Sequence, residues 1–581
     1  MPSNGPDWIR RSVLVASTAA LLFLVGALVR TTWMARSATG IAWGWDESMH
    51  AELPAVRMLL HVGRGELGAA FDVVLGCDRY PFVHPLALAG WQGLFGIGEH
   101  QARTLGLFLF SVLLLAGLAR LARRVALDGR EQADTPATLR SVSRDAALFA
   151  ALAGAASPLA RRYAPTLYLE IPALVGIVFA LEAWLARRTA ASRRRADVVA
   201  GLWIAVAFFT KFNYGLMLVA ALGLDALVSI ARSEERRAEF ASSVMTFAPL
   251  ALASLWWFVL PLPGGASDAA LHREAFMGFV TGNTALGPTA GWLRRVNWLT
   301  GVAPHPVLFA ALTGLGLLAL ATLRARTAST MLLVLAVFVL PVVLHPFHLD
   351  RFLLPASAII WTLGAVGAAR VLGARPVAFL VAASAVALTT LALDTFRIVT
   401  WAGLPAAEEG TPTRAYQEQH VSRALGVFAP PAANGLERQE HDALLDLVAG
   451  AVGPTARVAW IGQSSEVSPA ALHLGLLERR GDPERFLRDA HRPMDLTPVP
   501  ELTPSDHGPD DVLAFAAGFD AAVLCEGGDL KDRAARRWVV ERWHQPLLAS
   551  DRFEVRDLGA ISIARPNQAP LSRAIRLASP R

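Results

Sequence analysis

The stretch SVLVASTAALLFLVGALV, Ser12 to Val29, decides the fold class. It carries no charge, and a run of this length is enough to cross a bilayer as a helix. We interpret it as a retained first span. The apolar run is longer than the core of a typical signal peptide, and no clear small-x-small cleavage site follows it. Long apolar runs of the same kind recur as far as about Trp401.

The composition of the 581 residues agrees with this interpretation. The chain is 54% hydrophobic and only 18% charged, which is typical of a polytopic membrane protein. We predict about eleven transmembrane helices plus interfacial helices for residues 1–405. The span centres are expected near residues 21, 112, 153, 177, 205, 222, 250, 314, 336, 362 and 386.

Residues 406–581 have a different composition, in which charged residues and prolines separate short apolar runs. Segments such as RVAWIG, FDAAVLCEG, RFEVRDLG and AISIARP are typical of strands, and they alternate with segments that are typical of helices. We therefore expect a small C-terminal α/β extracytoplasmic domain that ends in an antiparallel pair of strands. The sequence shows no catalytic set in this part.

The formal net charge of +6 indicates orientation rather than a nucleic-acid partner. Most arginines fall in short loops between spans, and this pattern places those loops in the cytoplasm. The N-terminus is then cytoplasmic and the C-terminal domain lies outside the cytoplasmic membrane. The two cysteines, Cys77 and Cys525, fall on the outer side, where a disulfide is possible, although an inert core thiol is the favoured state of Cys525.

Polar residues accumulate on the outer side under this topology. Two loops there are long, about 30–101 and 262–304. The first contains amphipathic segments that are typical of helices in the membrane interface. The candidate site residues in or beside these segments are Asp46, Glu47, His50, Arg79, Tyr80, His84, Arg161, Arg162, Glu170, Lys211, His348 and Arg351. The topology was assigned from other residues, so their common side is an independent observation.

Each of these residues also has an ordinary structural explanation. Asp46 is well placed to cap an interfacial helix, Arg161 and Arg162 to anchor in headgroups, and Lys211 to snorkel. A single histidine is more often a hydrogen-bonded core residue than a ligand. Glu170 is harder to explain in this way, because a carboxylate among apolar residues of a span needs a partner.

Taken together, the set indicates transfer chemistry at a phosphate. A carboxylate can act as general base towards an acceptor, while Arg and Lys hold a phosphate or diphosphate. Asp46, Glu47 and His84 have no spacing that approaches a metal signature, so the sequence assigns no metal site and no cofactor and leaves metal dependence open.

Five segments, in order, resemble the GT-C polyprenyl-phosphate-dependent glycosyltransferases, and in particular the protein O-mannosyltransferase and lipid A aminoarabinose transferase group. The resemblance covers roughly residues 10–400. The segments are WDESMHAELPAVRMLL, YPFVHPLALAGWQGLFGIGEHQAR, ASPLARRYAPTLYLEIPALV, GLWIAVAFFTKFNYGLML and DRFLLPASAII.

The resemblance implies roles for individual residues. Asp46 matches the essential first-loop acid, with Glu47 as its neighbour, and Glu170 matches a second acidic position. Lys211 and Arg351 match basic positions that contact the donor phosphate.

Two departures from the family pattern are visible. Where many relatives have Lys-Pro-Pro, this chain has Arg79-Tyr80-Pro81, so phosphate contact there would pass to Arg79. Phe352 replaces a common Tyr. His348 and Asp350 have no role that the resemblance assigns.

The sequence therefore predicts a membrane glycosyltransferase, inverting by resemblance, with Asp46 as the base candidate. Its partners would be a polyprenyl-phosphate sugar donor, the lipid bilayer and an unidentified extracytoplasmic acceptor, which is a protein, a lipid or a polysaccharide. Two alternatives stay open. One is a secondary transporter or lipid flippase that uses Glu170 and Lys211 in a proton or substrate pathway, and the other is a non-catalytic scaffold.

Overall fold

The fold is known from a computed structural model of the chain. It describes residues 51–75, 81–128, 136–164, 167, 169–189, 192–258, 302–303, 306–344, 350–372, 438–452, 457–461, 495–498, 509–525, 544–565 and 568–581. The predicted span centres near 21 and 386 and the 405/406 boundary lie outside these residues.

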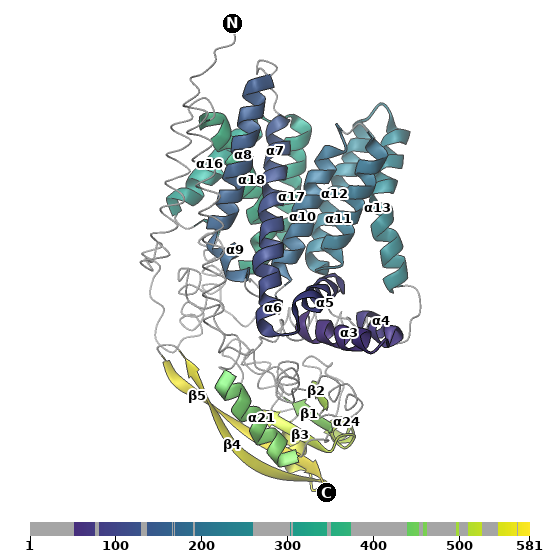
Figure 1. The fold of residues 1–581 in the computed structure, drawn as a ribbon, viewed down its shortest axis with the longest axis vertical. Coiled ribbons are helices and arrows are strands. Elements are labelled where there is room, and N and C mark those ends of the chain that lie inside the picture. Colours follow the sequence, from purple (N-terminus) through teal and green to yellow (C-terminus); the bar gives the residue numbers. More distant parts are fainter. Residues whose placement is uncertain are drawn as a thin grey trace.

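A bundle of helices makes up most of the described chain (Figure 1). Each of the other nine predicted span centres falls inside a helix, while the total of eleven spans stays a prediction. The helices are α7 (Ser111–Leu127), α8 (Pro136–Ala156), α9 (Pro158–Tyr163), α10 (Glu170–Ala186), α11 (Arg193–Phe208), α12 (Phe212–Arg232), α13 (Arg236–Phe258), α16 (Pro306–Thr322), α17 (Ala325–Leu344), the 3₁₀ turn η3 (Asp350–Leu353) and α18 (Leu354–Leu372).

Some of these helices are long and apolar enough to cross a membrane. Within the described residues, four segments meet both conditions of length and composition. They are Gln101–Leu127, Phe212–Arg232, Arg236–Trp256 and Arg351–Leu372.

Helix α10 lies at the centre of the bundle and packs against α7, α11 and α18. Every residue from Glu170 to Leu185 is buried, because apolar side chains surround the whole helix rather than one face. Close approach to α11 depends on Gly176. A Cβ atom there would lie 2.9 Å from the Ala207 backbone.

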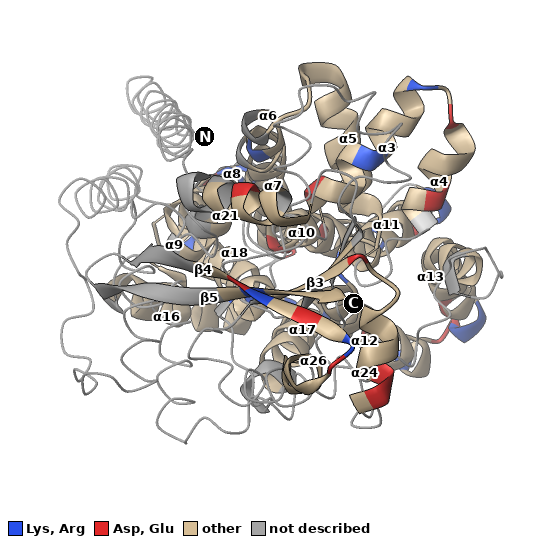
Figure 2. Cartoon of the chain, turned by 90° about the horizontal axis from the view of Figure 1, so that it is seen from below, with Lys and Arg blue, Asp and Glu red and all other residues tan. Residues whose placement is uncertain are grey.

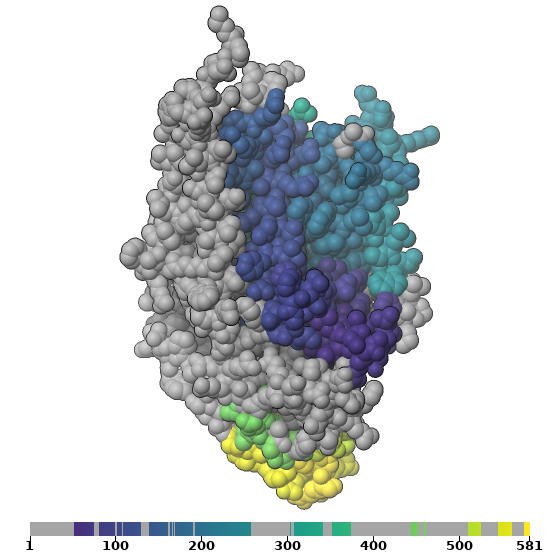
Figure 3. Space-filling model, in the orientation of Figure 1, coloured from purple at the N-terminus to yellow at the C-terminus, as the bar shows by residue number. Residues whose placement is uncertain are grey.

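Short helices cross the lower end of the bundle (Figure 1). They are α3 (Leu53–Gly63), α4 (Leu67–Leu75), α5 (Val83–Phe95), α6 (Glu99–Thr104) and the π-helical turn η2 (Leu105–Phe110), which leads into α7. Helices α3 and α5 fall within the first long outer loop, in the segments that we predicted to form interfacial helices. In Figure 3 this part of the chain is at the surface, between the bundle and the sheet.

A five-stranded sheet lies beyond this end, with strand order β2-β1-β3-β5-β4 (Figures 1 and 2). Strand β1 pairs in parallel with β2 and β3, while β5 is antiparallel to β3 and β4. The elements are α21 (Arg438–Val452), β1 (Arg457–Ile461), β2 (Asp495–Pro498), α24 (Pro509–Ala516), β3 (Ala521–Cys525), α26 (Gln545–Ala549), β4 (Phe553–Arg565) and β5 (Gln568–Pro580).

The terminal strands correct one detail of the sequence interpretation. RFEVRDLG and AISIARP form a single strand, β4, rather than two strands. An irregularity in the pairing with β5 lies between Asp557 and Gly559, where Gly559 has a φ of 101° that favours glycine. The partner of β4 is β5, which the sequence did not predict as a strand.

Candidate active site

A buried cluster of one acid and two bases lies where three helical segments begin. Glu170 is the first residue of α10, Lys211 immediately precedes α12, and Arg351 lies in the turn η3. Lys211 forms an ion pair with Glu170, and Arg351 Nε lies 3.4 Å from Glu170 Oε1. The Glu170 and Lys211 side chains are 1% and 3% exposed. The sequence predicted each of these residues, and the structure brings them together.

Local structure explains where the charges are placed. A carboxylate in the first turn of a helix faces free backbone N–H groups and the positive end of the helix dipole, which stabilise the anion at Glu170. Lys211 has an extended backbone between α11 and α12. At this break between the two helices, the Lys211 side chain contacts Glu170 of α10. Each of the two buried ions therefore has a protein partner in place of water.

Aromatic rings line the two cations. Lys211 Nζ lies 4.8 Å from the Tyr214 ring centroid and 5.3 Å from that of Phe352, and the Arg351 guanidinium is 5.7 Å from Phe352. Tyr214 also donates a hydrogen bond to the carbonyl of Arg351. Phe352 thus contributes ring faces to both cations. Tyr214 was not among the predicted site residues, although its place three residues after Lys211 was a usable signal.

His84 joins helix α5 to this cluster. Its Nε2 lies 3.2 Å from the carbonyl oxygen of Leu167, just before α10, so Nε2 carries the proton. Burial lowers the pKa of His84 to about 4, against smaller raising effects of the Leu167 hydrogen bond and the Glu170 charge. His84 is therefore neutral at physiological pH and fixes α5 against the turn that precedes Glu170.

The cluster as a whole is suited to an anion and to a hydrogen-bond donor. Glu170, Lys211 and Arg351 together carry one net positive charge. Oε2 of Glu170 and Nδ1 of His84 are buried acceptors that have no hydrogen-bond partner among the described residues. Lysine and arginine hold phosphate groups, while the acceptors fit a hydroxyl or an amine.

A second buried polar contact lies at the start of α3. Gln92 of α5 donates to Glu52 Oε2 at 2.7 Å, and its own oxygen accepts from the Gly98 backbone at 3.3 Å. Glu52 is 2% exposed and follows Glu47 by five residues in the sequence. The pair ties α3 to α5, and its Glu52 follows the predicted catalytic segment closely in the sequence. The sequence analysis did not select either residue.

Several predicted site residues cannot be compared with this geometry. Asp46, Glu47, His50, Arg79, Tyr80 and His348 lie outside the described residues. Arg161 and Arg162 belong to α9, which Ser157 caps through a 3.3 Å hydrogen bond from the Ala160 N–H, but their side chains are also outside the described part. The described residues contain no group of three or more His, Cys, Asp and Glu side chains that could hold a metal ion.

Comparison with known proteins adds information at the level of the fold. No protein-family profile and no curated protein sequence matches the chain. Solved structures do. ArnT from Cupriavidus metallidurans bound to undecaprenyl phosphate aligns over 97% of this chain and 98% of its own, with 15% identity and a TM-score of 0.54.

A second neighbour is the archaeal oligosaccharyltransferase AglB from Archaeoglobus fulgidus, in complex with an inhibitory peptide and a dolichol-phosphate. It aligns over 95% of this chain and 75% of its own, with 13% identity and a TM-score of 0.50. These neighbours are GT-C glycosyltransferases, as the five ordered segments predicted, and the chain shares their fold.

Proposed function

We propose that the chain transfers a sugar from a polyprenyl-phosphate carrier to an acceptor on the outer side of the cytoplasmic membrane. The observation that carries the proposal is the buried Glu170–Lys211–Arg351 cluster at the end of the bundle that the interfacial helices cover. The structural neighbours with bound undecaprenyl phosphate and dolichol-phosphate support a lipid-linked donor. The sugar would be a hexose or a pentose.

In the proposed reaction, an acceptor hydroxyl or amine attacks the anomeric carbon of the donor sugar. The bond from that carbon to the phosphate oxygen breaks as the new bond forms on the opposite face, and the proton of the acceptor passes to Asp46. Polyprenyl phosphate leaves with the bonding electron pair and gains negative charge. Lys211 and Arg351 stabilise that charge, because preorganised cations act most strongly in a buried site.

The remaining residues have supporting roles in this proposal. Glu170 holds Lys211 and Arg351 in place and offers Oε2 to the acceptor group. Arg79, Arg161 and Arg162 are further candidates for phosphate contact, and Glu47 is a neighbour of the base.

A transporter that uses Glu170 and Lys211 in a proton pathway is the alternative. Discontinuous helices near the membrane midplane are typical of many secondary transporters. Here both charges lie at helix starts, at the end of the bundle where α3 and α5 are found, and this placement favours chemistry at the membrane surface.

Sugar transfer in isolated membranes tests the proposal. The assay compares wild type with Asp46→Asn, Glu170→Gln and Lys211→Gln, using hexosyl and pentosyl polyprenyl phosphates. We expect each substitution to lower the rate by about 10²-fold or more. Glu235→Gln is the control, since Glu235 is exposed beyond the opposite end of α12 and should retain wild-type activity.

Loss of folding is separated from loss of chemistry by a double variant. Glu170→Gln alone raises the net charge of the cluster from +1 to +2, whereas Glu170→Gln with Lys211→Gln returns it to +1. We expect the double variant to be expressed better than Glu170→Gln alone and still to be inactive. Full activity of Asp46→Asn and Glu170→Gln would refute the mechanism. Consumption of a solute gradient without any consumption of lipid-linked sugar would favour the transporter.

A further inference from the structure

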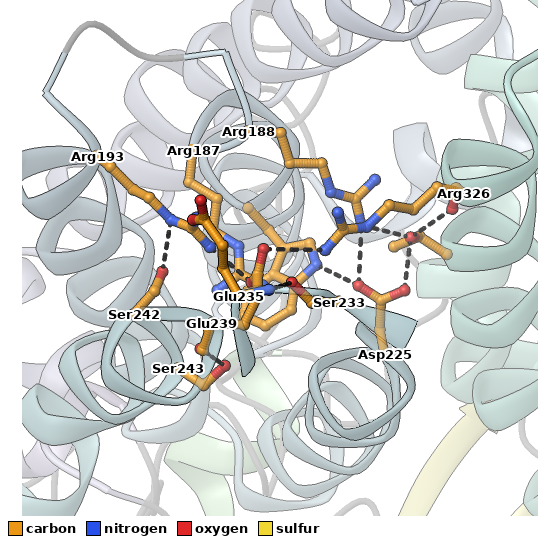
Figure 4. A network of polar contacts seen from close by, with 12 residues as sticks. Arg187, Arg188, Arg193, Asp225, Ser233, Glu235, Glu239, Ser242, Ser243 and Arg326 are labelled. Carbon is orange, nitrogen blue, oxygen red and sulfur yellow. Dashed lines mark hydrogen bonds and ion pairs between the residues drawn. The ribbon is translucent and has the colours of Figure 1, made fainter. Parts of the chain in front are cut away.

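A second polar network lies at the opposite end of the helices that form the candidate active site. It joins the C-terminal end of α10 to α11, α12, α13 and α17 (Figure 4). Its arginines are Arg187, Arg188, Arg193 and Arg326, and its acids are Asp197, Asp225 and Glu239. Among these side chains, four positive charges face three negative charges. Glu235, also drawn in Figure 4, joins the network through its backbone, and Asp128, which acts on Arg188, is itself paired with Arg324. The sequence analysis places this end of the bundle at the cytoplasmic surface.

The acids are already engaged within the protein. Asp225 accepts hydrogen bonds from Trp184 at 2.8 Å, from Arg188 at 3.0 Å and from Thr330 at 2.8 Å. Glu239 pairs with Arg193 at 2.6 Å and lies 3.8 Å from Arg326. The carboxylates thus have partners, and they do not use all the donors of the arginines.

Four guanidinium nitrogens remain without a hydrogen-bond partner among the described residues. They are Nε and Nη2 of Arg187 and Nε and Nη1 of Arg188. The Arg187 side chain is 1% exposed, and its guanidinium stacks 3.4 Å from the Trp184 ring centroid. Buried donors of charged groups are costly to leave unpaired, and of the two arginines only Arg188, whose side chain is 15% exposed, is open to an outside ligand. A ligand with several acceptor oxygens is therefore favoured beside Arg188. Phosphate has that chemistry.

Exposed apolar side chains lie on α12 and α13 near the network, next to the exposed charged residues of the loop that joins the two helices. On α12, Leu224, Leu227 and Val228 surround Asp225 in the sequence and are 47%, 63% and 42% exposed. On α13, Phe240 and Val244 flank Glu239 and Ser243 and are 60% and 50% exposed. Both helices are long and apolar enough to cross a membrane. An occupant of this position needs an anionic head and apolar chains, which free phosphate lacks.

We propose that this network binds the phosphate headgroup of an anionic phospholipid in the cytoplasmic leaflet, with its acyl chains along α12 and α13. Arg188 and Arg326 are the residues that reach the headgroup, since their side chains are 15% and 46% exposed. Arg187 lies behind them and orients the site through Trp184 and Thr246. Basic positions between spans on the cytoplasmic side are suited to such lipids.

Native mass spectrometry of the purified, delipidated full chain tests the proposal. Phosphatidylglycerol is the anionic probe, phosphatidylcholine the zwitterionic probe and inorganic phosphate the soluble probe. Both lipids carry a phosphate, but the arginines repel the choline cation of phosphatidylcholine. We therefore expect one phosphatidylglycerol to bind at least about tenfold more tightly than phosphatidylcholine. Inorganic phosphate at millimolar concentration should not displace it.

Substitutions distinguish binding at a specific site from binding through the overall positive charge of the surface. Arg188→Lys keeps the charge and can keep the Asp225 pair, but it removes the Nε and Nη1 donors. Arg326→Gln removes a charge from a half-exposed side chain, so it carries the test if Arg188→Lys is unstable without lipid. We expect each to weaken phosphatidylglycerol binding about tenfold. The matched control is Arg195→Gln, an exposed residue of α11 outside the network, which should change binding less than about twofold.

Three results would overturn the proposal. The first is an equal loss of binding in Arg195→Gln and Arg326→Gln with no loss in Arg188→Lys, which would mean that only bulk positive charge acts. The second is equal affinity for phosphatidylcholine. The third is complete displacement by inorganic phosphate, which would assign the network to a soluble anion. None of these results depends on the proposed sugar transfer.

Discussion

At the scale of single residues, burial decides which charges belong to the site. Glu170 was the hardest residue to explain from the sequence, because a carboxylate inside a span needs a partner. The structure provides two partners, Lys211 and Arg351. Their side chains come from segments that are far apart in the sequence, so no local pattern was able to predict the pairing. The predicted topology indicated only that all three residues lie on the outer side of the membrane.

His84 gives a pH-dependent prediction at this scale. Its pKa is about 4 in the folded chain and 6.5 in the unfolded chain, so the unfolded state binds more protons between these values. The stability should therefore be constant above about pH 6.5, fall as the pH decreases towards 4, and become constant again below it, so far as His84 determines it. The difference between these two pKa values corresponds to about 3 kcal/mol of stability.

The measurement is the apparent melting temperature of the purified chain between pH 7.5 and 4. His84→Gln is the comparison, because its amide can still donate to the Leu167 carbonyl but does not titrate in this range. We expect the wild type to lose more thermal stability than the variant over this interval. Parallel curves for the two proteins would contradict the assignment.

At the scale of elements, the length of apolar runs predicted the helices reliably, whereas the strands that depend on pairing with other strands were predicted less well. Nine predicted span centres fall in helices, because length and hydropathy are properties of one segment. Strand β5, QAPLSRAIRLASP, has two prolines and no regular alternation, and it was missed. It is a strand because it fits between β3 and β4, where Ile575 and Leu577 are fully buried. That contact depends on tertiary structure.

Helix packing gives a prediction at the same scale. A Cβ atom at Gly367 of α18 would lie 2.0 Å from the carbonyl oxygen of Leu315 in α16, which is a backbone atom and cannot rotate away. Gly367→Ala should therefore force α16 and α18 apart and destabilise the chain by about 1–3 kcal/mol.

Gly314→Ala in α16 is the matched control for this change. Nothing lies within 4 Å of a Cβ atom at Gly314, so alanine should be neutral or stabilise the helix by about 0.5–1 kcal/mol. Thermal unfolding of both purified variants in detergent measures the difference. Equal melting temperatures would mean that the two helices are not packed as closely as described.

At the scale of the whole molecule, the two charged clusters described above lie at opposite ends of the bundle. Glu170 and Lys211 begin α10 and α12, whereas Arg187 follows α10 and Asp225 lies in the second half of α12. Figure 1 shows the sheet and the short helices α3 to α5 at the lower end of the bundle, where α9 precedes the start of α10. From the arginine pattern we expect that side to face the exterior of the cytoplasmic membrane.

Cysteine labelling in intact cells tests this orientation. Gly68→Cys in α4 and Glu234→Cys between α12 and α13 are both exposed positions, and Cys77 and Cys525 are replaced by serine in each variant. A membrane-impermeable maleimide should label Gly68→Cys in intact cells and Glu234→Cys only after the membrane is opened. The reverse pattern would invert the topology and place the proposed active site in the cytoplasm.

The complete burial of α10 has a consequence for how the protein responds to its bilayer. The helix has 17 residues and is about 25 Å long, which is shorter than a typical hydrocarbon core of about 30 Å. Neighbouring helices shield it, so hydrophobic mismatch acts on lipid-exposed helices such as α12 and α13 rather than on α10. A change in membrane thickness therefore reaches Glu170 only through side-chain packing.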